Sequence, residues 1–129
     1  MKKILSIKSA FTLLEMLVVI GIIGILVGLG AVSYSTAQKK ARDAKRKQDL
    51  KAVQNCLEQY YSYNNNFKYP NYSSWPSSFN CGSSTLTAPS DPRNSSPYVY
   101  TISSSSDAYT ICATLETESP SSYCLTNQQ

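Results

Sequence analysis

Residues 16–32, MLVVIGIIGILVGLGAV, contain no polar side chain. About 20 apolar residues cross the hydrocarbon core of a bilayer as a single helix. A helix that is apolar on every side needs lipid or other helices around it. The run therefore predicts a helix for a membrane or a helix bundle. A secretory signal peptide is one alternative, because it also places an apolar segment after a basic one, here residues 1–9. A plain membrane anchor is the other, because the run is long enough to span a bilayer.

The helix is expected to continue to residue 63, because the chain contains no proline before Pro70. Apolar residues recur there at intervals of three and four, which is the spacing of one helix face. They are Ala37, Ala41, Ala44, Leu50, Val53, Leu57, Tyr60 and Tyr61. The second half of the helix is thus amphipathic and should pack one face on the rest of the chain.

The composition argues against an enzyme. The chain has no histidine and only 8 Asp+Glu, and the carboxylates are scattered. The commonest general base, the usual zinc ligand and a Ser-His-Asp arrangement are therefore missing together. The sequence also lacks the GxSxG, HExxH, P-loop and GxGxxG patterns. We expect no catalytic residue, no cofactor and no metal ion.

The rest of the chain, residues 64–129, is mainly polar and predicts a small head with short strands. Residues 97–103, 108–115 and 122–126 alternate between apolar and polar side chains, as strands with one buried face do. Residues 64–97 are rich in Asn, Ser and Pro and predict a long connection. We expect aromatic side chains to hold this connection, namely Phe67, Trp75 and Phe79.

The four cysteines predict two disulfides in an oxidising, extracytoplasmic compartment. Zinc is disfavoured because no pair has CxxC spacing and no histidine assists. If Cys112 lies opposite Cys124 in an antiparallel hairpin, Ile111 faces Leu125 on the apolar side, and directly opposed residues are within disulfide reach. We therefore favour Cys112–Cys124 and, by elimination, Cys56–Cys81, although four cysteines allow three pairings.

A cluster of basic residues follows the apolar run. Residues 38–51 carry seven cations and two anions, whereas residues 52–129 carry two cations and five anions. Such a cluster can contact the phosphates of nucleic acid or of lipid headgroups, and a solvated segment beside a membrane is the more ordinary interpretation. The candidate contact residues are Lys39, Lys40, Arg42, Lys45, Arg46 and Lys47.

The segment from Lys8 to Leu26, KSAFTLLEMLVVIGIIGIL, resembles the class III signal of type IV pilins and type II secretion pseudopilins. This resemblance implies that a prepilin peptidase cuts between Ala10 and Phe11 and methylates the new amine of Phe11. It also implies that Glu15 pairs with the amine of a neighbouring subunit during assembly. A carboxylate in a hydrocarbon layer is costly without such a partner. Farther along, residues 91–100, DPRNSSPYVY, resemble the segment that opens the sheet of major pseudopilins.

The resemblance implies an α+β, pilin-like fold with a long N-terminal helix packed on a small antiparallel sheet. The expected parts are a leader peptide at 1–10, a membrane or filament-core helix at 11–37, its amphipathic continuation at 38–63 and a disulfide-bonded head at 64–129. The expected function is that of a structural filament subunit of a type IV pilus. The alternatives are the major pseudopilin of a type II secretion system and, more distantly, a DNA-binding pilin for DNA uptake.

The same resemblance implies the partners and the location. The partners are further copies of the chain in a helical filament, a prepilin peptidase and an assembly platform in the inner membrane. The precursor would be a single-pass protein of the cytoplasmic membrane, and the product an extracellular pilus or a periplasmic pseudopilus. Nucleic acid is the least favoured partner.

Overall fold

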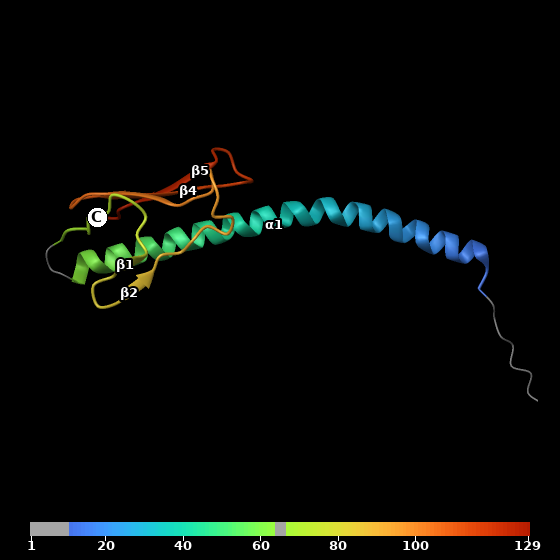
Figure 1. Cartoon of the computed structure of the whole chain (residues 1–129), viewed down its shortest axis with the longest axis horizontal. Helices are drawn as coiled ribbons and strands as arrows, with labels where there is room; N and C mark the ends of the chain where they lie inside the picture. The colour runs from blue at the N-terminus through green and yellow to red at the C-terminus, as the bar shows by residue number, and fades with distance from the viewer. Residues whose placement is uncertain (1–10, 64–66) are drawn as a thin grey trace, which may run out of the picture. The chain divides into compact units, whose positions relative to one another are not determined.

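The computed structural model of the chain describes residues 11–63 and 67–129. These residues form one long helix and five strands, in two antiparallel sheets of order β1-β2 and β3-β4-β5 (Figure 1). The elements are α1 (Leu13–Tyr63), β1 (Ser78–Asn80), β2 (Thr85–Thr87), β3 (Thr101–Ser104), β4 (Tyr109–Thr114) and β5 (Ser122–Thr126). The long helix with small antiparallel sheets confirms the predicted α+β, pilin-like fold. The chain divides into two compact units, Met1–Thr36 and Ala37–Gln129.

In the first unit, the part of α1 that reaches Thr36 buries none of its side chains, and it is long and apolar enough to cross a membrane. Leaving one large apolar side chain in water costs about 1.5–3 kcal/mol. This part of the helix therefore needs lipid or other helices around it. A Cβ added at Gly21 or Gly24 would meet no atom within 4 Å beyond the adjacent backbone of the helix itself. Any close packing that these glycines permit would thus come from a neighbouring helix.

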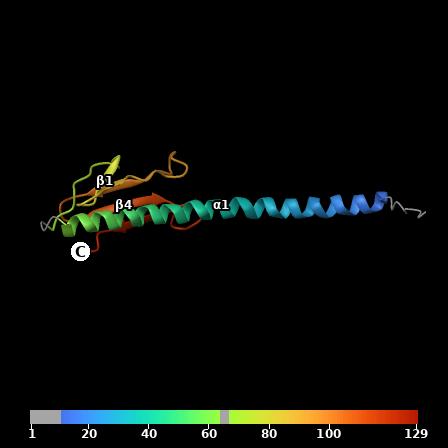
Figure 2. The same cartoon turned by 90° about the horizontal axis from the view of Figure 1, so that it is seen from below.

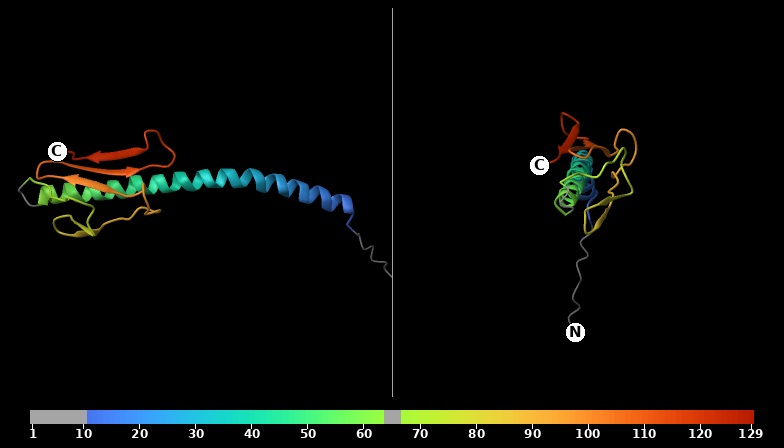
Figure 3. Two further views of the ribbon diagram at one scale, coloured as in Figure 1. Left: turned by 45° about the horizontal axis from the view of Figure 1, so that its top comes forward. Right: turned by 90° about the vertical axis from the view of Figure 1, so that its left-hand side faces the viewer.

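The core of the second unit joins the C-terminal half of α1 to the sheets. Leu50, Val53 and Leu57 recur at intervals of three and four on one face of the helix, and each is 0% exposed. The strand β4 alternates as expected, with Tyr109 and Ile111 buried. Figures 2 and 3 show the sheet β3-β4-β5 along this half of the helix, with the β1-β2 hairpin at a different position around it.

The register between β4 and β5 is the predicted one. In the pair β4–β5, Cys112 lies opposite Cys124 and Ile111 lies opposite Leu125. A disulfide joins Cys112 to Cys124, and a second joins Cys56 of α1 to Cys81 after β1. These are the two pairings that the sequence favours. The second bridge fastens the helix to the hairpin, and the first links neighbouring strands.

The predicted strand at 97–103 begins later in the structure, at Thr101. The residues before it form a turn in which the Tyr98 amide donates to the Ser95 carbonyl at 2.7 Å. Proline at position 97 has no N–H for a ladder, which explains why the alternation there does not become a strand. Phe67 also differs from the prediction, because it is 61% exposed, although its ring centre lies 5.6 Å from that of Tyr61.

The β1-β2 hairpin was not predicted, because its strands have three residues each and consist mainly of Ser, Thr and Asn. Its turn is closed by a hydrogen bond from the Cys81 amide to the Ser84 carbonyl, at 2.8 Å. Gly82 in this turn has a φ of 92°, a conformation that other residues rarely adopt. Phe79 anchors the hairpin, since it is 0% exposed and packs edge-on against Trp75.

Candidate functional site: the N-terminal segment and the arginine cluster

The start of α1 is capped by its own side chains. The Thr12 amide and hydroxyl both donate to Oε2 of Glu15, at 3.2 and 3.1 Å, and the Glu15 amide donates back to the Thr12 hydroxyl at 3.2 Å. This is a capping box, in which a Thr and a Glu three residues later satisfy free amides of the first turn. The negative charge of Glu15 also lies at the positive end of the helix dipole.

The cap leaves part of Glu15 available. In the described part of the chain, its hydrogen bonds go to Oε2 and none goes to Oε1. The neighbouring Phe11 is 73% exposed. Ala10, the residue before the predicted cut, lies outside the described residues, as does the rest of the predicted leader 1–10. The geometry therefore presents a fixed carboxylate with one free oxygen beside an exposed aromatic residue.

In the second unit, Arg46 is the centre of a buried cluster of charges. Its side chain is 0% exposed. Nε and Nη2 donate to the two carboxylate oxygens of Asp91 at 2.6 and 3.0 Å. Nη1 donates to Oδ1 of Asp43 at 2.7 Å and to Oε1 of Glu116 at 2.9 Å. A single guanidinium thus ties the helix to the loop before β3 and to the segment after β4.

The other groups of this arginine cluster complete its hydrogen bonding. Arg42 donates from Nε and Nη2 to both oxygens of Glu116, each at 2.7 Å. Asp43 accepts from the amides of Glu116 and Thr117, each at 2.9 Å, and from the Thr117 hydroxyl at 2.7 Å. The ring of Tyr98 lies 4.8 Å from the Arg46 guanidinium, within the range of a cation–π contact.

These contacts lower the pKa values of the three carboxyl groups and raise the pKa of Arg46, so all four groups stay charged. The hydrogen bond from Arg42 lowers the pKa of Glu116 to about 2, against the opposing effect of burial and with further help from Arg46. Burial would raise the pKa of Asp43 and of Asp91. For Asp43 the Glu116 amide and the Thr117 hydroxyl outweigh burial, and for Asp91 the main opposing group is Arg46, so both pKa values lie below normal. The hydrogen bond to Asp91 is the main cause that raises the pKa of Arg46.

Comparison with known proteins identifies a known motif in the N-terminal segment. Residues 5–31 match the family model described as the prokaryotic N-terminal methylation motif. The chain is also 41% identical, over 63 residues, to the type II secretion system core protein G of Aeromonas hydrophila, and this match covers 49% of the chain. The N-terminal segment therefore carries a prokaryotic N-terminal methylation motif, and about half of the chain is similar to a type II secretion core protein. It spans 43% of the length of that relative. No solved structure matches the chain.

Within this pilin-like chain, the arginine cluster overturns part of the predicted phosphate-binding surface. Arg46 is completely buried among carboxylates, so it cannot reach nucleic acid or a lipid headgroup. Arg42 is committed to Glu116, and Lys47 contacts Glu118 at 2.5 Å. The predicted surface thus loses Arg46, whereas Arg42 and Lys47 are half-buried and paired with acidic groups of the same unit.

The other three candidates, Lys39, Lys40 and Lys45, are exposed. Lys45 lies 3.8 Å from Asp49, one helical turn farther along. A surface ion pair of this kind contributes little to stability. These three candidate residues therefore remain accessible.

A second polar centre that sequence reasoning missed surrounds Glu58. Its Oε1 accepts from the Tyr109 hydroxyl at 2.7 Å and from the Gln128 amide at 3.0 Å, and its Oε2 accepts from the Tyr69 hydroxyl at 3.0 Å. Burial, followed by the hydrogen bond to Glu58, raises the pKa of both tyrosines. No sequence pattern marks this centre, since its members are far apart in the chain and belong to four different segments.

Proposed function

We propose that this chain is the precursor of a structural filament subunit, which assembles through its N-terminal helix and catalyses no reaction. The methylation motif at residues 5–31, together with the exposure of every apolar side chain of α1 up to Thr36, carries this proposal. A soluble protein would not leave such a helix uncovered. Lipid covers it in the precursor, and the helices of other subunits cover it in the filament.

The processing step follows from the motif. A prepilin peptidase would cut between Ala10 and Phe11 and methylate the amine of Phe11. The cut removes Lys2, Lys3 and Lys8 and leaves the apolar helix attached to the head. The subunit therefore stays in the cytoplasmic membrane until an assembly platform moves it into the filament. This differs from secretory cleavage, which would release the head without its helix.

Glu15 would then direct assembly. Its carboxylate lies in the apolar segment, where an unpaired charge costs a few kcal/mol. The capping box offsets part of this cost within one subunit, and Oε1 remains for the amine of Phe11 in a neighbouring copy. Pairing with that amine favours one axial register between adjacent helices.

The test compares Glu15→Gln with the wild type and with Asp107→Asn. The glutamine keeps the hydrogen-bonding reach of the cap but removes the charge, and Asp107 is an exposed carboxylate of the head that serves as the matched control. We expect Glu15→Gln to be cut and methylated but not assembled, and Asp107→Asn to form filaments normally. N-terminal peptide masses and the amount of sedimenting filament measure the two steps. Normal filaments from Glu15→Gln would refute the role of the charge, and a chain that starts near Tyr34 or at Met1 would refute the processing step.

Two filaments fit the proposal, a surface pilus and the pseudopilus of a type II secretion system. The match to core protein G of a type II secretion system favours the second. The same peptide measurement separates them when it is made on two fractions. N-methyl-Phe11 in material sheared from the cell surface supports a pilus. The same peptide confined to the cell envelope supports a pseudopilus.

A further inference from the structure

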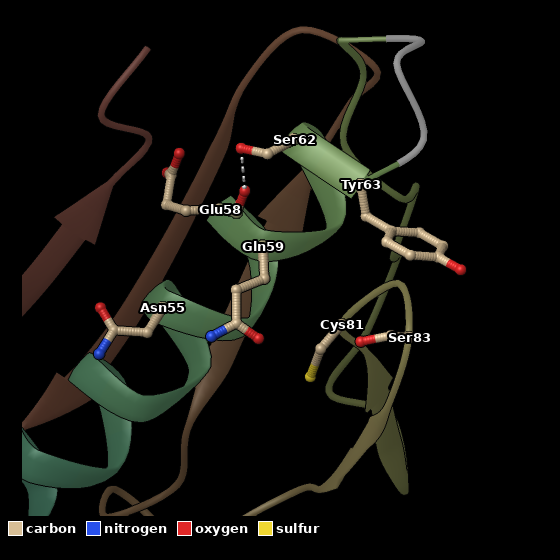
Figure 4. A pocket seen from close by; sticks show the side chains of 7 residues that line it. All are labelled: Asn55, Glu58, Gln59, Ser62, Tyr63, Cys81 and Ser83. Carbon is tan, nitrogen blue, oxygen red and sulfur yellow. Dashed lines mark hydrogen bonds between the residues drawn. The ribbon is translucent and has the colours of Figure 1, made fainter.

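A polar groove lies in the second unit, between the last turns of α1 and the turn of the β1-β2 hairpin. Its volume is about 650 Å³, which is within the usual range for small-molecule sites. Figure 4 shows the side chains that line it. Asn55, Gln59 and Tyr63 come from the helix, and Ser83 comes from the hairpin turn. Neither the filament role nor the arginine cluster uses this groove.

The helix side of the groove is a regular row of side chains. Asn55, Gln59 and Tyr63 are spaced by four residues, so they lie one above another on the same face of α1. In the part of the chain that the structure describes, neither amide side chain makes a hydrogen bond. Each amide offers one acceptor and two donors, and the Tyr63 ring is largely exposed beside them.

Two features hold the walls of the groove in place. The disulfide Cys56–Cys81 links the helix to the start of the hairpin turn. Gly82 packs so closely on Tyr63 that a Cβ at this glycine would come within 2.6 Å of the Tyr63 side chain. The groove is therefore largely formed before any ligand arrives, which lowers the entropy cost of binding.

The chemistry of the lining is neutral. Glu58 borders the groove, but its carboxylate points away from Gln59 and Cys81 (Figure 4), and Tyr69 and Tyr109 engage it on the other side. The described lining residues include no Lys or Arg to attract an anion, and no large aliphatic side chain to cover an apolar ligand. What remains is a set of amide and hydroxyl groups next to one aromatic ring.

We propose that this groove binds a neutral saccharide. Sugar hydroxyls both donate and accept hydrogen bonds, so they match side-chain amides, and the C–H face of a sugar ring can lie on the tyrosine ring. Tyrosine provides a large contact area with few rotatable bonds, which suits recognition by a rigid surface. The occupant is a chain of a few uncharged hexose units. This site would give a filament built from the chain an affinity for uncharged glycans, and it does not depend on which filament the chain forms.

The test is a titration of the full-length chain, with its disulfides intact, in dodecylphosphocholine, because sugar-based detergents would compete. The probes are cellohexaose, maltohexaose and chitohexaose, and the readout is the shift of the side-chain amide NMR signals of Asn55 and Gln59. We expect saturable shifts with at least one probe. Gln59→Ala should weaken binding about tenfold or more, which corresponds to about 1.4 kcal/mol. Gln48→Ala is the matched control, because it removes an exposed amide elsewhere on the same helix and should leave the affinity unchanged.

Three results would overturn the proposal. The first is that none of the three probes shifts these signals at millimolar concentration. The second is binding that Gln59→Ala does not weaken, because the site would then lie elsewhere. The third is binding of hexagalacturonate, an acidic probe run beside the three neutral ones, at least as tightly as the best neutral probe, which would contradict the neutral character of the groove. Burial of Asn55 and Gln59 on filament formation, in the absence of any saccharide shift, would make the groove a contact between copies of the chain.

Discussion

Arg46→Met tests whether the arginine cluster holds the second unit together. Methionine keeps most of the side-chain volume and removes four hydrogen bonds to three carboxylates. Removing one partner of a buried ion pair typically costs about 3–5 kcal/mol, because the other charge is left unpaired in the interior. We expect a loss of this size in the free energy of unfolding near pH 7, measured by urea denaturation of the detergent-solubilised chain with intact disulfides.

Most of the lost unfolding free energy should come from Asp91, whose charge is left without a cation. Without Arg46, Asp43 still accepts from the Glu116 and Thr117 amides, and Glu116 still pairs with Arg42. Asp91 keeps the Arg93 amide but loses both guanidinium bonds. The double variant Arg46→Met/Asp91→Asn should therefore be more stable than the sum of the two single changes predicts, by about 1–3 kcal/mol.

The difference in unfolding free energy between the wild type and Arg46→Met should be smaller at low pH. In the wild type the pKa values of Asp91 and Glu116 are lowered, so their contribution is complete above the ordinary carboxyl pKa of about 4 and is lost as the pH falls toward about 2. In Arg46→Met, Asp91 is a buried carboxylate without its cation, so its pKa should lie above normal and its penalty should disappear as it takes up a proton. The stability difference should narrow by more than about 1 kcal/mol between pH 7 and pH 4. A difference below about 1 kcal/mol at pH 7, or one independent of pH, would refute this reasoning.

Further predictions concern the cap, the Glu58 centre and the disulfides. Thr12→Val should speed amide exchange in the first turn of α1 about fivefold, for a lost cap of about 1 kcal/mol, whereas Thr12→Ser should not. Glu58→Gln should lower the pKa of Tyr109, seen as earlier ionisation in an alkaline absorbance titration, because an uncharged acceptor opposes tyrosinate formation less. Replacing both cysteines of Cys56–Cys81 by alanine should cost about 3.5 kcal/mol and those of Cys112–Cys124 about 3 kcal/mol, because their sequence separations are 25 and 12. Urea denaturation under oxidising conditions measures both.

The sequence predicted those parts of the molecule in which one local pattern decides the structure. The apolar run and the three- and four-residue spacing of Leu50, Val53 and Leu57 predicted α1 to its last residue. The register of β4 with β5 followed from alternation and from the positions of Cys112 and Cys124. Each of these patterns is repeated over several neighbouring residues, so one residue that departs from it does not hide it.

The parts that were missed depend on tertiary contacts. The β1-β2 hairpin is held by the buried side chain of Phe79 and by a disulfide, whereas the Ser, Thr and Asn residues of its strands are exposed. The Glu58 centre exists only because Tyr69, Tyr109 and Gln128 meet one turn of the helix. No residue of such a centre has a sequence environment that distinguishes it from an ordinary surface residue, so the fold has to be known first.

The role of the basic segment depends on which cations it contains more than on their number. The excess of cations at residues 38–51 and the excess of anions at 52–129 are two halves of an internal match, as the contacts of Arg46 with Asp91 and Glu116 show. Arginine presents a planar fork that binds a carboxylate through two parallel hydrogen bonds, which lysine cannot do.

Whether each cation is an arginine or a lysine therefore indicates whether it binds a carboxylate of the same chain. The two arginines of the segment, Arg42 and Arg46, make the two-pronged contacts, with Glu116 and Asp91, whereas Lys39 and Lys40 stay exposed. Arginines one helical turn apart, followed by a distant excess of carboxylates, indicate an internal anchor for a small head. Neighbouring lysines indicate a solvated face. By this reasoning, Arg42→Lys should destabilise the second unit while conserving its net charge, and Lys40→Arg should leave its stability unchanged.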